Sequence, residues 1–331
     1  MVRLFREDDA TLEPLVGKTI AVLGYGNQGR AQSLNMRDSG MTIIVGNADD
    51  KYAADAREDG FEIHSIRDAT AKGDIILSLL PDEVTPAIYA ESIRPGLKAG
   101  DTLVFASGYC ICFDQISFPD DINVVMVAPR TMGALVRESY LNGRGFLSFL
   151  DAHQDVDGQA WPIALALAKA IGSLKYYAMQ ATFKSEAELD LFTEQALVPA
   201  IAAALMTAVE VLVAAGYDKI ESALEMYLSG EMGDILHEAA HLGFVGQTSL
   251  HSPTSRYGTK SRLHLFATPE FRKNMEEILV NVQNRSFANE WAAEQAGDYQ
   301  HFRALEKSMA DSVFAQVERD VMHELAAATP Q

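Results

Sequence analysis

The chain has 331 residues, of which 48% are hydrophobic and 22% are charged. This composition excludes a disordered or collagen-like chain, and the length predicts about two domains. Because 46 acidic residues face 27 basic ones, the formal charge is −19. A surface of this sign repels nucleic acid and anionic membranes, so we expect neither as a partner.

The cysteine content and the N-terminus bear on where the protein works. Two cysteines cannot build a disulfide framework, which fits a reducing compartment. The first residues hold no apolar signal core, and we find no unbroken apolar run of the length that a membrane span requires. We therefore expect a cytoplasmic protein without a transmembrane segment.

Short apolar runs alternate with helical stretches over the first half of the chain. The runs predicted as strands are residues 20–23, 42–45, 75–80, 102–105, 124–127 and 146–150, and the helices are 30–39, 52–59, 86–93 and 162–171. Several strands are continuously apolar, as parallel strands covered by helices on both faces must be. This order predicts a doubly wound parallel sheet of the Rossmann type, in a domain of residues 1–181.

The pattern changes to long helices from about residue 182. Apolar residues recur at three- and four-residue spacing over residues 186–215, 221–240, 269–284 and 286–296. We therefore predict an all-helical second domain, residues 182–331.

The run after the first of these strands has the spacing of a dinucleotide-binding turn. Gly24, Gly26 and Gly29 fit G-x-G-x-x-G between an apolar strand and a helix, which is the context that the pattern requires. The free N–H groups of the helix start would hold a pyrophosphate. The residues expected to contact the cofactor here are Gly24, Tyr25, Gly26, Asn27, Gln28 and Gly29.

The loop after the second strand bears on the choice of nucleotide. It reads GNADDK over residues 46–51, with two acids and no arginine. An acid at this place accepts hydrogen bonds from the ribose 2′-hydroxyl, whereas an arginine would receive a 2′-phosphate. Through Asn47, Asp49 and Asp50 the loop predicts a preference for NAD(H) over NADP(H). The alternative is that both acids only face water.

Several segments, in this order, resemble short-chain ketol-acid reductoisomerase. They are residues 17–40 around the glycine turn, LLPDEV at 79–84, VMVAPR at 125–130, GRGF at 143–146 and ELDLFTEQ at 188–195, and the resemblance extends to about residue 296. It implies a Rossmann domain, a knotted helical domain and a homodimer or larger homo-oligomer. It also implies two magnesium ions that hold a 2-acetolactate-type substrate during alkyl migration, before a hydride from the cofactor reduces the ketone. This reaction belongs to branched-chain amino-acid biosynthesis.

The resemblance also implies particular site residues. On the nicotinamide side of the cofactor it points to Leu80, Pro81, Asp82, Gly108 and Gly133.

Acidic residues of the second half suggest a metal site. Glu186, Asp190 and Glu194 lie at i, i+4 and i+8, so they share one face of the predicted helix and repel one another. A hard divalent cation would relieve this repulsion, and a solvated acidic face is the alternative. The resemblance matches Asp190, Glu194 and Glu225 to metal-binding carboxylates of the family, with Glu194 also catalytic. We expect them to hold Mg²⁺, as one ion or two, unless the site has been lost.

The chain departs from the family pattern at other positions. Ser107 stands where the family typically has a histidine, and Arg130 where it has a lysine; we expect both to be catalytic residues in contact with the substrate. In the family, a second metal-binding carboxylate follows four residues after the one that Glu225 matches. This chain has Ser229 at that position. The nearest acid, Glu231, is about 600° around a helix from Glu225 and is expected on another side.

A polar loop between helices is expected to cover the substrate. It holds His251, Ser252 and Arg256, and Ser252 matches a substrate-binding serine of the family. Arg256 replaces a glutamate and suits a substrate carboxylate.

These departures decide how far the family's reaction is expected to survive. Serine cannot gain a proton near neutral pH as histidine can, and arginine cannot give one up. Alkyl migration needs Lewis-acid polarisation of the substrate, whereas hydride transfer requires less. We predict an NAD(P)H-dependent oxidoreductase that reduces a 2-oxo acid or a related carbonyl or imine, with migration impaired or lost. The alternatives are a working ketol-acid reductoisomerase and a non-catalytic nucleotide-binding protein.

Two further patterns are not expected to carry chemistry of their own. His237 and His241 fit H-E-x-x-H, but a short pattern with two wildcards arises easily by chance and no third ligand follows at the expected spacing, so they are considered only as candidates for lining the altered pocket. Cys110 and Cys112 would face one side of an extended segment, and we interpret them as small buried fillers.

Overall fold

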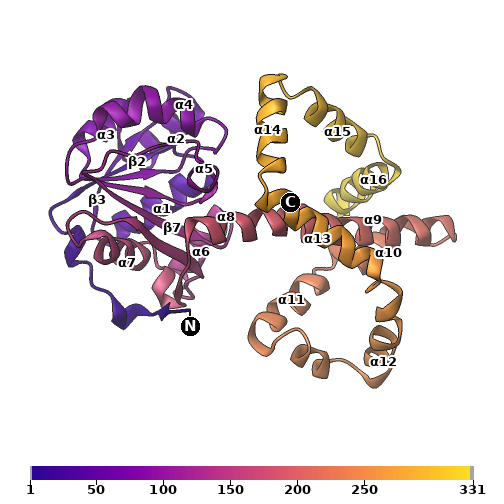
Figure 1. The fold of residues 1–331 in the computed structure, drawn as a ribbon. Helices are drawn as coiled ribbons and strands as arrows, with labels where there is room; N and C mark the ends of the chain where they lie inside the picture. The colour runs from indigo at the N-terminus through magenta and orange to yellow at the C-terminus, as the bar shows by residue number, and fades with distance from the viewer. Residues whose placement is uncertain (1, 329–331) are drawn as a thin grey trace. The chain divides into compact units, whose positions relative to one another are not determined.

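The computed structural model describes residues 2–328, which form two compact units divided between Leu189 and Asp190 (Figure 1). The division falls inside helix α8 (Phe183–Phe192), close to the domain boundary proposed from the sequence at residues 181 and 182. Each unit is described by itself below.

The first unit is built on a nine-stranded sheet of order β1-β9-β8-β7-β6-β5-β2-β3-β4. Its strands are β1 (Leu4–Phe5), β2 (Thr19–Leu23), β3 (Thr42–Gly46), β4 (Glu62–His64), β5 (Ile75–Ser78), β6 (Thr102–Phe105), β7 (Asn123–Pro129), β8 (Ser148–Gln154) and β9 (Ala178–Gln180). The strands from β4 to β7 pair in parallel, and β8 runs antiparallel to β7. All the strands predicted from apolar runs are present. The short strands β1, β4 and β9 were not predicted, because two or three residues show no alternation.

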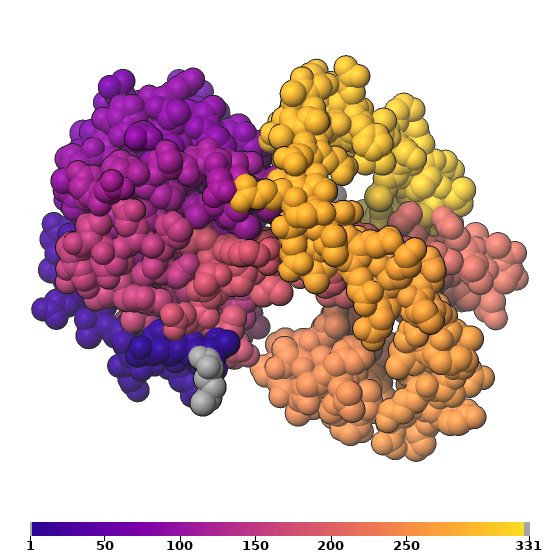
Figure 2. Space-filling view, in the orientation of Figure 1, coloured from indigo at the N-terminus to yellow at the C-terminus, as the bar shows by residue number. Residues whose placement is uncertain are grey.

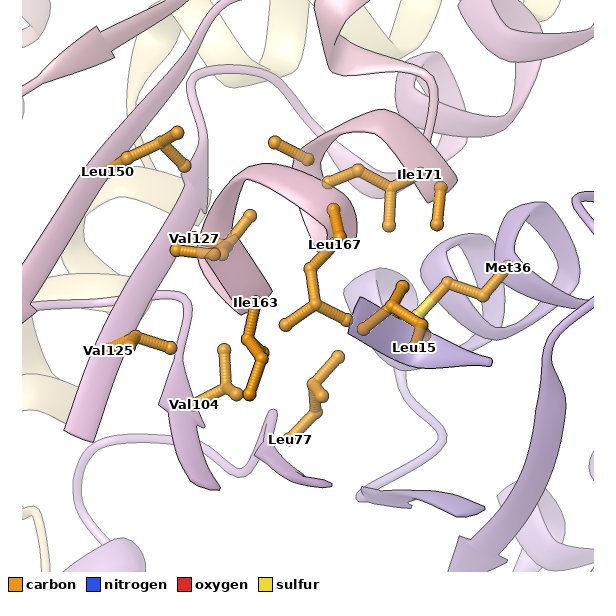
Figure 3. Close-up of a cluster of buried hydrophobic side chains, with 14 of the residues drawn as sticks. Leu15, Met36, Leu77, Val104, Val125, Val127, Leu150, Ile163, Leu167 and Ile171 are labelled. Carbon is orange, nitrogen blue, oxygen red and sulfur yellow. The ribbon is translucent and has the colours of Figure 1, made fainter. Parts of the chain in front are cut away.

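Helices cover both faces of this sheet. They are α1 (Asn27–Asp38), α2 (Lys51–Glu58), α3 (Ile66–Lys72), α4 (Thr85–Ile88), α5 (Tyr109–Cys112), α6 (Gly133–Leu141) and α7 (Ala160–Ala170). Alternate side chains of β2 enter two different cores, since Ile20 and Val22 face one and Ala21 and Leu23 the other. The first core also holds Leu167 of α7 (Figure 3). The doubly wound Rossmann-type sheet predicted from the sequence is therefore confirmed.

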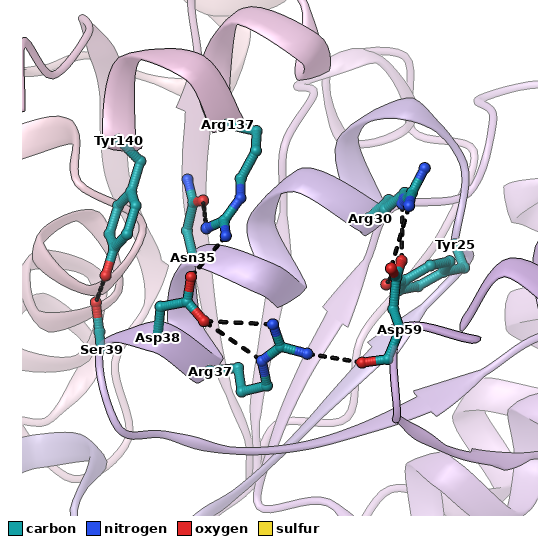
Figure 4. A network of polar contacts seen from close by, with 9 residues as sticks. All are labelled: Tyr25, Arg30, Asn35, Arg37, Asp38, Ser39, Asp59, Arg137 and Tyr140. Atoms are coloured by element: carbon teal, nitrogen blue, oxygen red, sulfur yellow. Dashed lines mark hydrogen bonds and ion pairs between the residues drawn. The ribbon is translucent and has the colours of Figure 1, made fainter. Parts of the chain in front are cut away.

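A polar network ties helix α1 to its neighbours (Figure 4). Asp59, at the end of α2, accepts hydrogen bonds from the Tyr25 hydroxyl at 2.8 Å and from Arg30 Nε at 2.7 Å. The hydrogen bond from Arg30 is the main reason why the pKa of Asp59 lies below its ordinary value. On the other side, Arg137 of α6 donates to Asp38 at 2.6 Å. The helix that follows the glycine turn is thus fixed against both α2 and α6.

The second unit is helical throughout its described residues, as predicted. After α8 it contains the π-helical turn η6 (Thr193–Leu197), α9 (Val198–Ala214), α10 (Lys219–Ala223), the π-helical turn η7 (Leu224–Leu228), α11 (Glu231–Leu242), α12 (Pro253–Arg262), α13 (Pro269–Gln283), α14 (Ser286–Ala296), α15 (Gln300–Ala310) and α16 (Val313–Ala328). The helix predicted over residues 221–240 is interrupted at Gly230, whose φ is +87°. The expectation of a polar loop around residue 253 is wrong, because helix α12 starts there.

The second unit leaves much of its apolar surface uncovered. Its helices stand apart with openings between them in the space-filling view, whereas the first unit has a closed surface (Figure 2). Leu197, Ile201 and Val211 along η6 and α9 are 49%, 42% and 61% exposed. Apolar faces of this kind usually mark an interaction surface.

One helix in the described part of the chain is long and apolar enough to cross a membrane. It spans residues 183–214, with a mean hydropathy of 2.2 in its most apolar window. The helix contains no unbroken apolar run of that length, but its mean hydropathy is high because Glu210 is the one charged residue between residues 195 and 215. The core helix of a protein outside the membrane has the same composition, so this feature does not by itself indicate a membrane protein.

Candidate cofactor and substrate sites

The glycine turn between β2 and α1 is closely packed at Gly24 and Gly29 and open at Gly26. Gly24 has a φ of +90°, and a Cβ on it would lie 2.9 Å from the Leu79 carbonyl oxygen. A Cβ on Gly29 would lie 2.0 Å from the Gly24 carbonyl oxygen, so α1 can start here only with glycine. No atom lies within 4 Å of the corresponding position on Gly26. This open position is where a pyrophosphate would approach the backbone.

A cavity of about 520 Å³ borders this turn. Tyr25, Gly26 and Asn27 line it together with residues of α1, α2 and α6. Gly133 lets the start of α6 pack against the turn, since a Cβ on Gly133 would lie 2.1 Å from the Asn27 carbonyl oxygen. Gln28 Nε2 donates to the Thr131 carbonyl at 2.9 Å, which fixes the segment before α6.

The loop after β3 uses part of its polar groups to hold its own shape. Asn47 Oδ1 accepts the Tyr25 N–H at 3.0 Å, and Asp50 caps α2 by accepting the Tyr52 N–H at 2.9 Å. The side chain of Asp49 is 89% exposed and lies 3.2 Å from Arg57. The sequence reasoning missed Arg57, because it lies outside the loop and only helix α2 brings it back to Asp49.

The segments after β5 and β6 lie at the same edge of the sheet as the glycine turn, because these strands are parallel to β2. Leu80, Pro81 and Asp82 follow β5, and Ser107 and Gly108 follow β6. Ser107 Oγ donates to Asp82 Oδ2 at 3.2 Å. The structure thus gathers these predicted cofactor and substrate residues at the carboxyl ends of the strands, where dinucleotides bind in sheets of this type.

Helix α5 follows Gly108 and carries the C-x-C pattern. Because this segment is one helical turn and not extended, Cys110 and Cys112 point to different sides. Burial is the main cause that raises the pKa of the Cys110 thiol, so it is a poor nucleophile. Burial also raises the pKa of Tyr109 to about 12, and the charge of Asp82 adds to this.

Arg130 and Glu186 form a buried ion pair. Arg130 Nη1 lies 2.6 Å from Glu186 Oε1, and the Glu186 side chain is 1% exposed. The other carboxylate oxygen of Glu186 accepts the Gly108 N–H at 2.6 Å. The guanidinium also lies over the Phe149 ring, 5.2 Å from its centroid. Glu186 and Asp190 lie four residues apart on α8, and Arg130 and Gly108 hold the carboxylate of Glu186. The sequence did not predict these two partners.

The remaining metal candidates lie at helix irregularities. Asp190 is in the last turn of α8, whereas Glu194 and Glu225 are each the second residue of a π-helical turn, η6 and η7. Such turns occur frequently at functional sites. Among residues 2–328, no three or more His, Cys, Asp or Glu side chains gather closely enough to hold a metal ion by themselves.

A second cavity, of about 320 Å³, lies within the second unit and brings together charged residues of both signs. Glu225 and Glu231 line it, as do His251, Arg256 and Lys260. The expectation that Glu231 lies on another side is wrong. It assumed one continuous helix, whereas the chain turns at Gly230 and α11 starts afresh at Glu231.

The other polar residues of this region take different places. Ser252 caps α12 by accepting the Ser255 N–H at 3.2 Å, and it is not among the residues that line the cavity. His237 and His241 lie on α11 with ring centroids 5.0 Å apart, and they do not line the cavity either. Lys260 was missed from the sequence, because no spacing rule relates it to Glu225.

The fold and the glycine turn define a class of protein. A doubly wound sheet that carries G-x-G-x-x-G after β2, followed by an all-helical unit, is typical of oxidoreductases that bind a nicotinamide dinucleotide.

Comparison with known proteins identifies the family. The profile of "Acetohydroxy acid isomeroreductase, NADPH-binding domain" matches residues 14–176, and that of "Ketol-acid reductoisomerase, C-terminal domain" matches residues 183–326. The chain therefore belongs to the ketol-acid reductoisomerase family, whose members are NAD(P)-dependent oxidoreductases. The second match extends well beyond residue 296, where the resemblance noted in the sequence ended.

Individual relatives agree with this assignment. A ketol-acid reductoisomerase (NADP(+)) of Methanocaldococcus jannaschii is 38% identical over 327 residues, which is 97% of each chain. One from Petrotoga mobilis is 39% identical over 323 residues, 96% of each chain. The solved structure of an NADH-preferring ketol-acid reductoisomerase from an uncultured archean superposes with a TM-score of 0.92 at 35% identity, over 97% of this chain and 98% of that one. A semialdehyde dehydrogenase NAD-binding protein from Cupriavidus necator, with a TM-score of 0.62 at 16% identity, shares only the fold.

Proposed function

We propose that the protein is an NAD(P)H-dependent reductase of the ketol-acid reductoisomerase type in which alkyl migration is impaired or lost. Its substrate is a 2-oxo acid or a related carbonyl or imine. A hydride from the nicotinamide would reach the substrate carbon, and a proton would complete the alcohol or amine.

The ion pair of Arg130 with Glu186 carries this proposal. Arginine stays charged at physiological pH, and a buried carboxylate already balances that charge at 2.6 Å. Arg130 can therefore act neither as a general acid nor as a general base while the alkyl group migrates. Ser107, which bonds to Asp82, does not titrate near neutral pH either.

A working ketol-acid reductoisomerase is the second candidate, and the position of Glu231 favours it. We propose that Asp190, Glu194 and Glu225 bind Mg²⁺, since carboxylate oxygens are the ligands that it prefers. Bound Mg²⁺ would polarise the substrate oxygens, as alkyl migration requires. Glu231 lines the same cavity as Glu225 and would supply the carboxylate that is missing at Ser229.

For the substrate we propose contacts at the cationic wall of the second cavity. Arg256 suits a carboxylate by its paired N–H donors, and His251 lies in the same lining. Ser252 remains a proposed contact through its hydroxyl hydrogen, because its oxygen already accepts the Ser255 N–H.

For the cofactor we propose a preference for NADH. The exposed carboxylate of Asp49 is placed to accept hydrogen bonds from ribose hydroxyls, and it also engages Arg57, the cation that would otherwise receive a 2′-phosphate. Asp49→Ser is expected to reduce the ratio of kcat/KM for NADH over NADPH by about tenfold, the equivalent of one or two hydrogen bonds. A wild-type preference for NADPH would overturn this proposal.

We also propose that the protein is cytoplasmic and forms a homodimer or a larger homo-oligomer through its second unit. The uncovered apolar residues of η6 and α9 support self-association. A knotted path of the helical unit is proposed on the family resemblance.

The decisive experiment follows NADH and NADPH oxidation with 2-acetolactate and, separately, with 3-hydroxy-3-methyl-2-oxobutyrate, each with and without Mg²⁺. The second compound is already rearranged and needs only reduction. Turnover of this compound with no turnover of 2-acetolactate supports the proposal. Turnover of 2-acetolactate establishes the working reductoisomerase instead. If cofactor binds and neither compound reacts, another carbonyl or imine, or a non-catalytic role, has to be tested.

A further inference from the structure

The π-helical turn η7 presents different residues on its two sides. Glu225 and Met226 line the cavity of the second unit, whereas Tyr227 is absent from its lining. Two residues correspond to about 200° around a helix, so Tyr227 and Glu225 point in nearly opposite directions. Contacts on the Tyr227 side can therefore act on Glu225 only through the backbone of the turn.

Tyr227 is held by the C-terminal helix α16. Its hydroxyl donates to Glu318 Oε1 at 2.6 Å, and its ring lies 6.1 Å from the Phe314 ring, between centroids. A hydrogen bond of this length to a carboxylate is stronger than one between neutral groups. Tyr227 thereby joins η7 to a helix about ninety residues further along the chain.

A separate contact docks the same helix beside η7. Val321 of α16 is fully buried, and Lys219 of α10 lies 2.9 Å from Asp320. The position of α16 thus does not depend on Tyr227 alone. Its contact with Tyr227 can be removed while the helix stays in place.

The turn η7 has an uncommon hydrogen-bonding pattern, which the contact between Tyr227 and Glu318 can stabilise. The Ser229 N–H donates to the Leu224 carbonyl at 3.0 Å, five residues back, where an α-helix would bond four residues back. A return to the commoner α-helical bonding would shift the turn by one residue. Such a shift would rotate Glu225 by about 100° away from the cavity.

We propose that Tyr227 and Glu318 are positioning residues, through which helix α16 fixes the π-helical turn and aims Glu225 into the cavity of the second unit. This rests on the proposed role of Glu225 as a magnesium ligand. Neither residue contacts the substrate or the metal ion.

The test is the affinity of the full-length protein for Mg²⁺ alone, measured by titration calorimetry. Tyr227→Phe removes only the hydroxyl and is expected to weaken Mg²⁺ binding about tenfold, with a melting temperature close to that of the wild type. Glu318→Ala removes the same hydrogen bond from the other helix and should match it. Glu318→Gln keeps an acceptor and should recover most of the affinity. Lys219→Met is the control, because it breaks the neighbouring contact with Asp320 and leaves Tyr227 bonded.

The outcomes separate this inference from the proposed function. If Glu225→Gln weakens Mg²⁺ binding and Tyr227→Phe does not, the positioning role is wrong and the metal role stands. If Lys219→Met lowers the affinity and the melting temperature as much as Tyr227→Phe does, Tyr227 is only a stability residue and the inference fails. If the wild type binds no Mg²⁺, the metal role fails and the positioning role falls with it.

Discussion

The two units of this protein bury their apolar residues in different ways. In the first unit, neighbouring residues of β2 such as Ile20 and Ala21 are fully buried on opposite faces of the sheet. In the second unit, apolar residues such as Val211 and Phe266 are 61% and 72% exposed. A sheet between two helical layers completes its core within one chain, whereas exposed apolar faces of helices usually mark an interaction surface. The first unit is thus expected to fold by itself and the second to depend on a partner.

The largest expected effect is in the core of the first unit. Leu167 of α7 is 1% exposed, so Leu167→Ala should lower the free energy of unfolding by about 3 kcal/mol through lost contacts and a new cavity. Urea denaturation measures this change. Leu141 of α6 is 66% exposed, and Leu141→Ala should change the value by less than about 0.5 kcal/mol. Equal losses at both positions would show that this core does not carry the stability of the unit.

The next largest effect is on cofactor binding and should leave binding of the metal ion unchanged. Gly26→Ala should fold normally, because no atom lies within 4 Å of the new methyl group. The methyl group would occupy the space of the pyrophosphate and weaken NADH binding about a hundredfold, as measured by fluorescence titration, with Mg²⁺ affinity unchanged. Gly29→Ala, which meets the Gly24 carbonyl at 2.0 Å, should lose stability as well. Wild-type NADH affinity in Gly26→Ala would mean that the cofactor binds elsewhere.

A smaller effect is expected on association through the second unit. Ile201 lies on α9 and is 42% exposed, so Ile201→Asp would place a charge in the proposed interface. We expect self-association to weaken about thirtyfold, measured as molar mass by light scattering over a range of concentrations. Val16→Asp, at a position of the first unit that is 72% exposed, is the matched control and should leave the mass unchanged. If Ile201→Asp also leaves the mass unchanged, α9 is not covered by a second copy.

The smallest effect concerns pH and the polar network of the first unit. The pKa of Asp59 is lowered in the folded protein, chiefly by the hydrogen bond from Arg30. Its carboxylate therefore stabilises the fold above the ordinary pKa of about 4, and this stabilisation is lost as the pH falls through the lowered value. Asp59→Asn should cost about 1 kcal/mol at pH 7 in urea denaturation. The two proteins should converge once the pH falls below the lowered pKa of Asp59, and a difference that stays constant with pH would contradict the role of the charge.

More of the candidate site could be predicted from the sequence in the first unit, whose core is closed, than in the second unit, whose apolar faces are exposed. In the first unit, the glycine turn was identified from the sequence because it is a local pattern, whereas the residues after β5 and β6 were matched only through the family resemblance. The pairing of Glu186 with Arg130 was not predicted, since the two residues are fifty-six positions apart and no spacing rule connects them. In the second unit, Glu231 was placed on the wrong side because the π-helical turn and Gly230 break a helix that the apolar pattern shows as continuous.

The sequence by itself determined the Rossmann-type sheet, the helical second half, the dinucleotide turn and the family. All of these are expressed by residues within a few positions of one another, where backbone preference and the spacing of apolar side chains decide the outcome. Only the tertiary structure decided that Glu186 neutralises Arg130, that Arg57 reaches Asp49, and that Glu231 lines the cavity of Glu225. These contacts depend on how whole helices pack and on where a helix is interrupted, as at η7 and Gly230. Such long-range geometry leaves no local pattern in the chain.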